Sequence, residues 1–204
     1  KKIIFYVNIK LIFKSKLKKQ LSEKNTKLAE KPFLGKKVLI PIIETSHYQH
    51  HHILGLGKSL KMRGAAVKVL VCAEFLNGCE LKSFKNENDK DPCWNCRLNF
   101  ENTTPQYDLE IIKLEDCLPK KKLESIKKKA RKFVDIEGEI KSNGVSLKRS
   151  INESLVRYFY GAVPDDKIKI NKIKTFHTET ALITAEIAAI LDKKWQPDVV
   201  LNNM

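Results

Sequence analysis

The sequence lacks any apolar run long enough to cross a membrane. A spanning helix needs about 18–20 continuous apolar residues, and the apolar stretch at residues 3–13 is broken by Asn8 and Lys10. Two leading lysines followed by apolar residues imitate the start of a signal peptide, but the lysine-rich residues 15–19 form a poor cleavage site. These absences argue against a membrane-spanning segment and against a cleaved export signal.

Cysteine is scarce, and its number is odd. The five cysteines are Cys72, Cys79, Cys93, Cys96 and Cys117. An odd count without a clear export signal argues against a disulfide framework and favours a reducing compartment. We therefore expect a cytoplasmic protein, with a peripheral position on the inner membrane face as a further option.

Glycine-rich phosphate loops are also missing. The run Gly55-Leu56-Gly57-Lys58-Ser59 resembles part of a phosphate loop, but the GxxxxGK[ST] spacing fails because position 52 is His52. The run also lies inside a predicted helix rather than before one. Both a nucleoside-triphosphate loop and a GxGxxG dinucleotide motif are therefore excluded, and no internal repeat of fixed period is present.

Positive charge is abundant but unevenly placed. The formal net charge is +15, and residues 1–37 hold twelve lysines against only Glu23 and Glu30. The remainder of the chain carries a commonplace charge. The basic character therefore belongs mainly to an N-terminal arm, which we expect to be helical and amphipathic and to lie on an anionic membrane surface. A solvated basic extension is the alternative.

The length of 204 residues and the apolar content of 42% suit one globular domain with a substantial core. Residues 38–43 form a continuous apolar run, which is typical of a strand buried on both faces. A predicted helix with Ile53, Leu56 and Leu60 on one face follows and is capped by Gly64; residues 66–72 then form a second strand. This order is a βαβ unit, whose strands should be parallel.

Further elements extend the same pattern. Strands are predicted at residues 109–114 and 199–202, and helices after Pro119, at residues 150–162 ending before Pro164, and at residues 173–190. Residues 77–109 are polar and form an excursion from the core. The fold class is therefore α/β, a Rossmann-like parallel sheet flanked by helices, with a basic helical arm at 1–37 before a domain at 38–204.

The polar loop at residues 44–52 is the first candidate site. It leaves the carboxyl end of the first strand, where parallel sheets place ligand loops, and it holds four of the five histidines. Glu44 or a histidine there could act as general base on a hydroxyl group. Three consecutive histidines at 50–52 would point in different directions on a helix, so a shared metal is disfavoured. Solvent-facing histidines at a helix start are the structural alternative.

The Cys93-Trp94-Asn95-Cys96 motif is the second candidate site. One CxxC pair is moderate evidence for zinc, and Cys79 is the favoured third ligand because it begins the same polar excursion. A redox CxxC usually starts a helix directly after a strand, whereas this one is predicted in a loop. Structural zinc at Cys79, Cys93 and Cys96, unligated thiols, and redox or disulfide chemistry all stay open.

The helix after Pro119 carries lysines and an arginine around most of its surface. A solvated face is the first interpretation of such a run, and contact with an anionic membrane or polymer is the second.

The segment from Val38 to Gly64 resembles the start of a GT-B fold glycosyltransferase, in which the first helix ends in an "L…RGH.V" pattern. Here Arg63-Gly64 is followed by Ala65, where the pattern usually has His, and then by a second strand. The order of Cys72, Cys79 and the CxxC motif, then Tyr158-Phe159, then Trp195-Gln196-Pro197-Asp198, is similar to a subgroup described as capsule or surface-polysaccharide biosynthesis proteins.

The resemblance covers residues 38–204 and implies the N-terminal, acceptor-binding half of such an enzyme. It implies a nucleotide-sugar donor bound mainly by a C-terminal domain outside this chain, so we expect a truncated chain that is inactive alone. Its acceptor would be a glycan or a lipid-linked glycan. Glu44 and His47 would face the interdomain cleft as catalytic candidates, with Ser46, His50 and His51 binding substrate.

Two other functions stay open at this stage. One is a zinc-stapled basic module that binds anionic lipid or nucleic acid; nucleic acid is the weaker partner because charge outside the arm is evenly spread. The other is a sugar-nucleotide epimerase of similar fold.

Overall fold

The computed structural model describes residues 32–43, 47–79, 81–82, 92–133 and 138–202. Most of the predicted basic arm, residues 1–31, lies outside this range. Among the described helices, none combines the length and the hydropathy needed to cross a bilayer.

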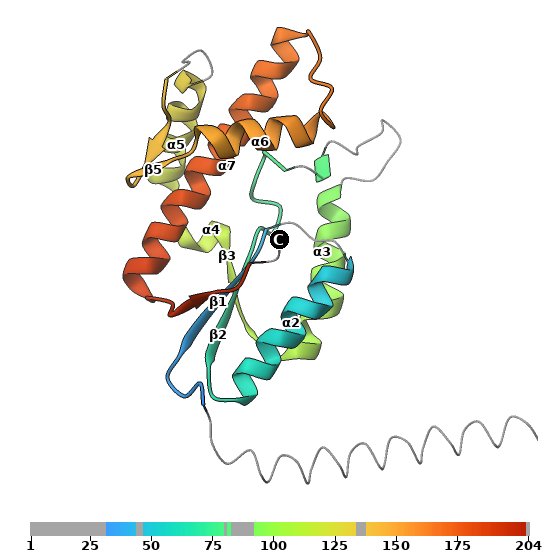
Figure 1. Cartoon of the computed structure of the whole chain (residues 1–204), viewed down its shortest axis with the longest axis vertical. Helices are drawn as coiled ribbons and strands as arrows, with labels where there is room; N and C mark the ends of the chain where they lie inside the picture. Colours follow the sequence, from blue (N-terminus) through green and yellow to red (C-terminus); the bar gives the residue numbers. More distant parts are fainter. Residues whose placement is uncertain (1–31, 44–46, 80, 83–91, 134–137, 203–204) are drawn as a thin grey trace, which may run out of the picture.

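A four-stranded parallel sheet forms the centre of the molecule (Figure 1). Its strands are β1 (Lys37–Ile42), β2 (Ala66–Val71), β3 (Glu110–Lys113) and β6 (Val199–Val200), in the order β3-β2-β1-β6. Val38 pairs with Val67 of β2 on one side and with Val199 of β6 on the other. The predicted parallel α/β architecture is therefore confirmed, and all four predicted strands are present.

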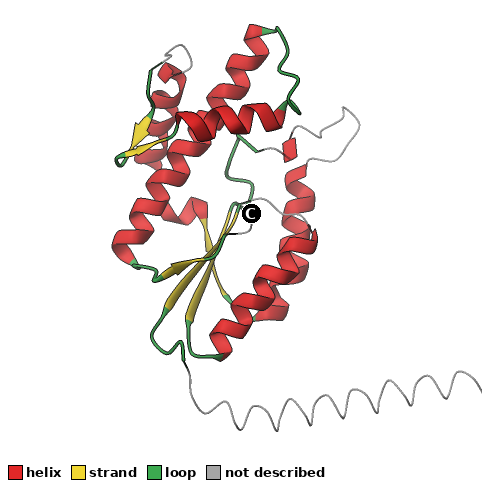
Figure 2. Cartoon of the chain, in the orientation of Figure 1, coloured by secondary structure: helices red, strands yellow, loops and turns green. Residues whose placement is uncertain are grey.

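Alternate residues of the central strands face two separate cores. Helices cover both sides of the sheet (Figure 2). Val38, Ile40 and Ile42 point toward the side covered by α2 (His47–Met62), whereas Leu39 of β1 packs on the side of α7 (Lys167–Lys194). Ile40 and Val69 have no exposed surface. Burial on both faces explains why these strands are continuously apolar rather than alternating.

The crossover helix α2 fits tightly against the sheet. A Cβ on Gly57 would lie 2.7 Å from the Cδ1 atom of Ile40 and 3.1 Å from that of Leu109. Gly64 then adopts a φ of 98°, which places it in the left-handed region that ends a helix. Its role as the C-terminal cap is confirmed.

The remaining elements surround the sheet. They are α3 (Pro92–Thr103), the 3-10 helix η2 (Thr104–Tyr107), α4 (Leu114–Cys117), α5 (Lys120–Phe133), α6 (Lys148–Tyr158) and the two-residue strands β4 (Lys141–Ser142) and β5 (Val145–Ser146). Helices α5 and α6 both pack against α7. Together, α4, α5, α6 and α7 cover one face of the sheet, and α2, α3 and η2 cover the other.

Three sequence predictions about element boundaries were wrong. The loop predicted at residues 44–52 ends early, because α2 already begins at His47. The CxxC motif lies in the first two turns of α3 rather than in a loop. Helix α6 ends at Tyr158, before the left-handed Tyr160 and Gly161, and not at Pro164.

Candidate functional site

A large cavity opens at the carboxyl edge of the parallel sheet. Its volume is about 1280 Å³. The strand ends contribute Ile42, the last residue of β1, then Ile43, Cys72 after β2 and Asn202 after β6. This edge is where open parallel α/β sheets bind their ligands, because the strand-following loops converge there. The cavity is therefore the candidate functional site.

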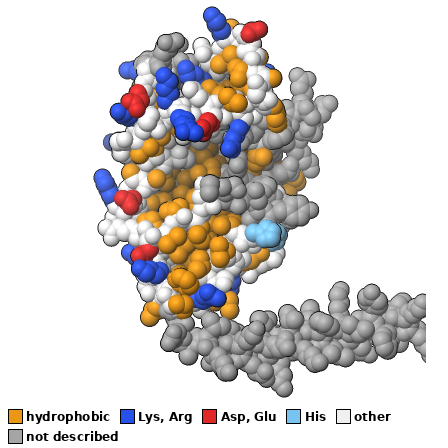
Figure 3. All heavy atoms as spheres, viewed as in Figure 1, with side chains coloured by type: hydrophobic (Ala, Val, Ile, Leu, Met, Phe, Trp, Pro, Cys, Tyr) orange, Lys and Arg blue, Asp and Glu red, His pale blue; other side chains and the backbone are white. Residues whose placement is uncertain are grey.

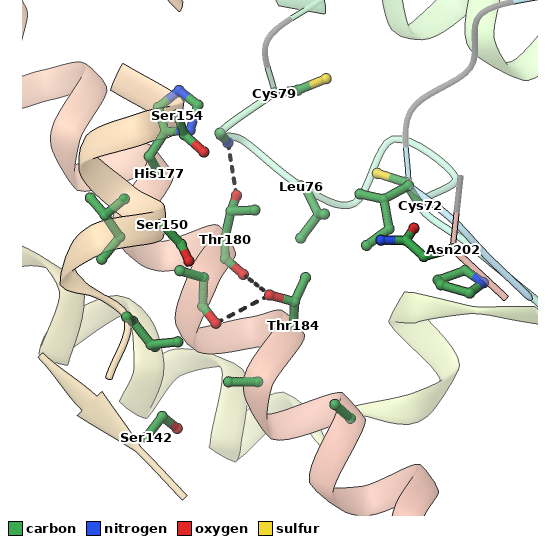
Figure 4. A pocket seen from close by; sticks show the side chains of 18 of the residues that line it. Cys72, Leu76, Cys79, Ser142, Ser150, Ser154, His177, Thr180, Thr184 and Asn202 are labelled. Carbon is green, nitrogen blue, oxygen red and sulfur yellow. Dashed lines mark hydrogen bonds between the residues drawn. The ribbon is translucent and has the colours of Figure 1, made fainter. Parts of the chain in front are cut away.

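Two helices and a hairpin build the opposite wall. Figure 4 shows Ser150 and Ser154 of α6 beside Thr180 and Thr184 of α7, with Cys72 and Asn202 across the cavity. Asn143, in the β4–β5 turn, also lines the cavity, and its amide nitrogen lies 3.4 Å from the carbonyl oxygen of Ala185. The wall is thus rich in neutral hydroxyl and amide groups.

Small side chains leave room along α7. Ala181, Ala185, Ala188 and Ala189 all line the cavity. Alanines on a helix usually allow close packing against a neighbouring element. Ala181 and Ala185 do pack partly against the core, but the same four residues also form the wall of the hollow.

Charged groups are few in this wall. Among the described lining residues, Arg157 of α6 is the one lysine or arginine and Asp192 of α7 is the one carboxylate. Both are exposed. A cavity with a single cation does not provide the clustered positive charge that a polyphosphate needs. Its donors and acceptors suit a neutral ligand with many hydroxyl groups, since Ser, Thr and Asn side chains both donate and accept hydrogen bonds.

Helix α7 contributes a buried histidine, His177, to the cavity lining. Its relative exposure is 5%, its ring lies edge-on to Tyr158 with centroids 5.7 Å apart, and its Nε2 atom has no hydrogen-bond partner among the described residues. Burial lowers the pKa of His177 because the charged imidazolium loses hydration. The imidazole is therefore held neutral at neutral pH.

Residues 76–79, which follow β2, cover one side of the cavity. The backbone N–H of Gly78 donates to Thr180 Oγ1 at 3.0 Å, and the amide of Asn77 donates to Glu179 Oε1 at 3.2 Å. These contacts hold Leu76, Gly78 and Cys79 over α7, and all three line the cavity. Burial also raises the pKa of the Cys72 thiol, with a smaller contribution from nearby Cys96.

The predicted loop site is only partly described. Glu44 and Ser46 lie outside the described residues, and of His47 only the backbone, at the start of α2, is described. His50 is buried and lines the cavity. His51 points elsewhere: it does not line the cavity, and its Nδ1 lies 2.9 Å from Tyr107 Oη. The three consecutive histidines therefore face different directions, as predicted.

The predicted zinc ligands are spread over two elements. Cys79 lines the cavity, whereas Cys93 and Cys96 lie in the first turns of α3 and do not line it. Within the described residues, no group of three or more His, Cys, Asp or Glu side chains is arranged to hold a metal ion. Structural zinc at these cysteines stays a prediction, and Glu80 and residues 83–91 lie outside the described range.

Most of the cavity wall was not predicted from the sequence. Ser150, Ser154, Arg157, His177 and Thr184 were not proposed as site residues. A helix–loop–helix pairing of α6 with α7 brings them together, and no short motif marks it in the sequence. The one available signal was the run of small and hydroxylated residues on the predicted last helix.

Comparisons with known proteins add no relative. No family model, no curated protein and no solved structure matches the chain. The cavity and the sequence resemblance are therefore the observations that bear on function.

Proposed function

We propose that this chain is the acceptor-binding half of a glycosyltransferase, which transfers a sugar from a nucleotide-sugar to a surface or capsular glycan. The observation that carries the proposal is the cavity at the carboxyl edge of the parallel sheet. Its wall presents Ser150, Ser154, Thr180 and Asn202, while it holds one cation among its described residues. The resemblance of residues 38–64 to the opening of GT-B enzymes supports the same assignment.

The polar wall matches a glycan better than a nucleotide. Each sugar hydroxyl can donate one hydrogen bond and accept others, and serine, threonine and asparagine side chains have the same dual capacity. A diphosphate needs several cations or a helix N-terminus with free amides. We therefore assign the glycan acceptor to this cavity, and the donor to a second domain.

Catalysis would require a base beside the acceptor hydroxyl. Glu44 and His47 remain our candidates, because they follow β1 at the edge of the sheet where Ile43 lines the cavity. A general base must come within hydrogen-bond reach of the proton that it removes. In this proposal Ser46 and His50 contribute to binding, whereas His51 acts structurally through Tyr107.

Saturation-transfer NMR on the 204-residue chain tests the proposal. The probes are the neutral glycans maltotetraose, chitotetraose and mannotetraose, together with UDP, each at millimolar concentration. We expect transfer of saturation from the protein to at least one glycan, which reports binding, and none to UDP. Transfer to UDP alone would assign the cavity to a nucleotide and overturn the acceptor role, as would the absence of transfer to all three glycans.

A steric variant locates the binding. Ala188 is exposed and lines the cavity, so Ala188→Phe should project a bulky ring into the hollow without disturbing the core. Ala162→Phe is the matched control, because Ala162 is exposed and does not line the cavity. We expect Ala188→Phe to abolish the saturation-transfer signal of the glycan. Ala162→Phe should preserve that signal. Equal transfer in both variants would place the glycan elsewhere.

A further inference from the structure

The connection between α6 and α7 exposes large apolar side chains. Val156, Tyr160, Val163 and Ile168 have relative exposures of 51%, 63%, 45% and 84%. They lie in the last turn of α6, the following connection and the first turn of α7. We call residues 156–174 the α6–α7 tip. Figure 3 shows apolar side chains gathered at the top of the molecule, where Figure 1 places the start of α7.

The exposure of Ile168 is not a consequence of fraying. Asp166 caps α7, and its Oδ1 accepts hydrogen bonds from the backbone N–H groups of Ile168 and Lys169, both at 3.0 Å. The backbone that carries Ile168 is therefore fixed in the first helical turn. A fixed, exposed isoleucine, in a segment with further exposed apolar residues, is typical of an interaction surface.

Basic residues are interspersed with these apolar residues along the sequence of the tip. The tip contains five basic residues, namely Arg157, Lys167, Lys169, Lys172 and Lys174, against the two carboxylates Asp165 and Asp166. Lys167 and Lys169 directly flank Ile168, and both are exposed. With five basic residues against two carboxylates, the tip carries a formal net charge of +3.

A segment that combines exposed apolar side chains with basic residues suits an anionic lipid surface. An anionic lipid bilayer attracts lysine and arginine through its headgroups, while apolar and aromatic side chains enter the boundary between headgroups and acyl chains. Tyrosine favours that boundary because its ring is apolar and its hydroxyl stays hydrated. A protein partner would instead be expected to exclude lysine from the centre of its contact.

We propose that the α6–α7 tip docks on an anionic membrane surface, with Ile168, Tyr160 and Val163 inserted between lipid headgroups. The tip continues the wall that α6 and α7 give the cavity, so docking would hold the cavity close to the membrane. The proposal rests on surface composition and does not depend on glycan binding. It also differs from the membrane contact predicted for residues 1–37. The start of β1 and the start of α7 lie at opposite ends of the molecule (Figure 1).

Fluorescence quenching by brominated lipid tests insertion at the tip itself. The 204-residue chain with Ile168→Trp is mixed with vesicles of phosphatidylcholine and phosphatidylglycerol at a 7:3 ratio, with or without brominated acyl chains. Wild type, which carries only Trp94 and Trp195, gives the background. We expect the introduced indole to be quenched well beyond that background. Quenching equal to wild type on vesicles that retain the protein would overturn the proposal.

Vesicle co-sedimentation measures the contribution of the apolar residues. We expect the double variant Ile168→Ser/Val163→Ser to lower the partition coefficient on the same vesicles by about tenfold or more, since two apolar side chains no longer leave water. The matched control is Leu56→Ser/Met62→Ser, which removes two exposed apolar residues of α2. A partition that falls equally in both variants, or in neither, would contradict docking through the tip; circular dichroism confirms folding of each.

Discussion

The backbone N–H of Gly78 donates a hydrogen bond to the side chain of Thr180, at 3.0 Å. The two residues are far apart in sequence, and the contact holds the segment after β2 against α7. It is possible only because Gly78 has no side chain: a Cβ there would lie 2.5 Å from the carbonyl oxygen of Phe176 and 2.8 Å from the Cα of His177. The position of residues 76–79, which cover the cavity, therefore depends on one glycine.

Gly78→Ala should destabilise the protein. The added methyl group meets backbone atoms of α7, which cannot rotate away, so the segment must shift and lose the bond to Thr180. We expect the free energy of unfolding to fall by about 1–3 kcal/mol, the usual cost of overpacking. Urea denaturation followed by circular dichroism measures it.

Gly55→Ala is the matched control for that variant. Gly55 lies within α2, and a Cβ there would have an ordinary contact of 3.8 Å with Tyr107. Alanine is favoured over glycine in a helix interior by about 0.5–1 kcal/mol. We therefore expect Gly55→Ala to be neutral or slightly stabilising. Equal losses in the two variants would show that the close approach of Gly78 to α7 does not determine stability.

His177 should make stability depend on pH. Burial lowers its pKa in the folded state, so below about pH 6.5 the unfolded chain binds a proton that the folded chain does not. Its contribution to stability is therefore complete above that pH and is lost as the pH falls toward its folded pKa. One such group changes the free energy of unfolding by at most about 1.4 kcal/mol per pH unit.

Replacing His177 with leucine should flatten that dependence. We expect the free energy of unfolding of His177→Leu to fall less than that of wild type between pH 7.5 and 5.5. His52→Leu is the control, because it makes the same substitution at an exposed histidine. Identical slopes for wild type and His177→Leu would show that another group titrates in this range.

The sequence was sufficient to predict the sheet because its signal is local. The central strands read as continuous apolar runs, and Gly64 marked the end of the crossover helix, so β1, β2 and their parallel pairing followed from short segments. The start of α2 was missed because polar residues at 47–52 resemble a loop, although His50 packs inward near Phe100.

The cavity wall could not be predicted in the same way. Ser150, Thr180 and Asn143 belong to three separate elements, and only the packing of α6 and the β4–β5 turn on α7 brings them to one surface. Their sequence neighbourhoods are ordinary helix and turn sequences. The position of the cavity at the carboxyl edge of the sheet did follow from the predicted topology.

Cys72 should react slowly with alkylating reagents. Burial raises its pKa above the ordinary value of 9.0, so little of the reactive thiolate is present near neutral pH. We expect the rate of alkylation by iodoacetamide at Cys72, followed by peptide mass spectrometry, to reach half its maximum above pH 9.0. In denaturant the same profile should return to the ordinary value. A profile in the native protein centred below pH 9.0 would contradict burial of this thiol.

Asp198 should stabilise the junction between β6 and β1 in a pH-dependent manner. Its carboxylate accepts hydrogen bonds from the Lys37 N–H at 2.8 Å and from Lys36 Nζ at 3.2 Å. The bond from the Lys37 backbone, followed by that from the Lys36 side chain, lowers the pKa of Asp198. The stabilisation is therefore complete above the ordinary pKa of 3.8 and is lost as the pH falls through the lower folded value.

Asp198→Asn tests that junction. We expect a lower urea midpoint than wild type at pH 6, and a difference that shrinks below pH 4, where wild type also loses the charge. Asp192→Asn removes another exposed carboxylate, one that makes no ion pair within the described part of the chain, and should leave the midpoint unchanged. If both variants lower the midpoint equally, net charge rather than the contact with Lys37 explains the effect. A constant difference from pH 6 to pH 3 would instead assign it to geometry, because protonation would then not matter.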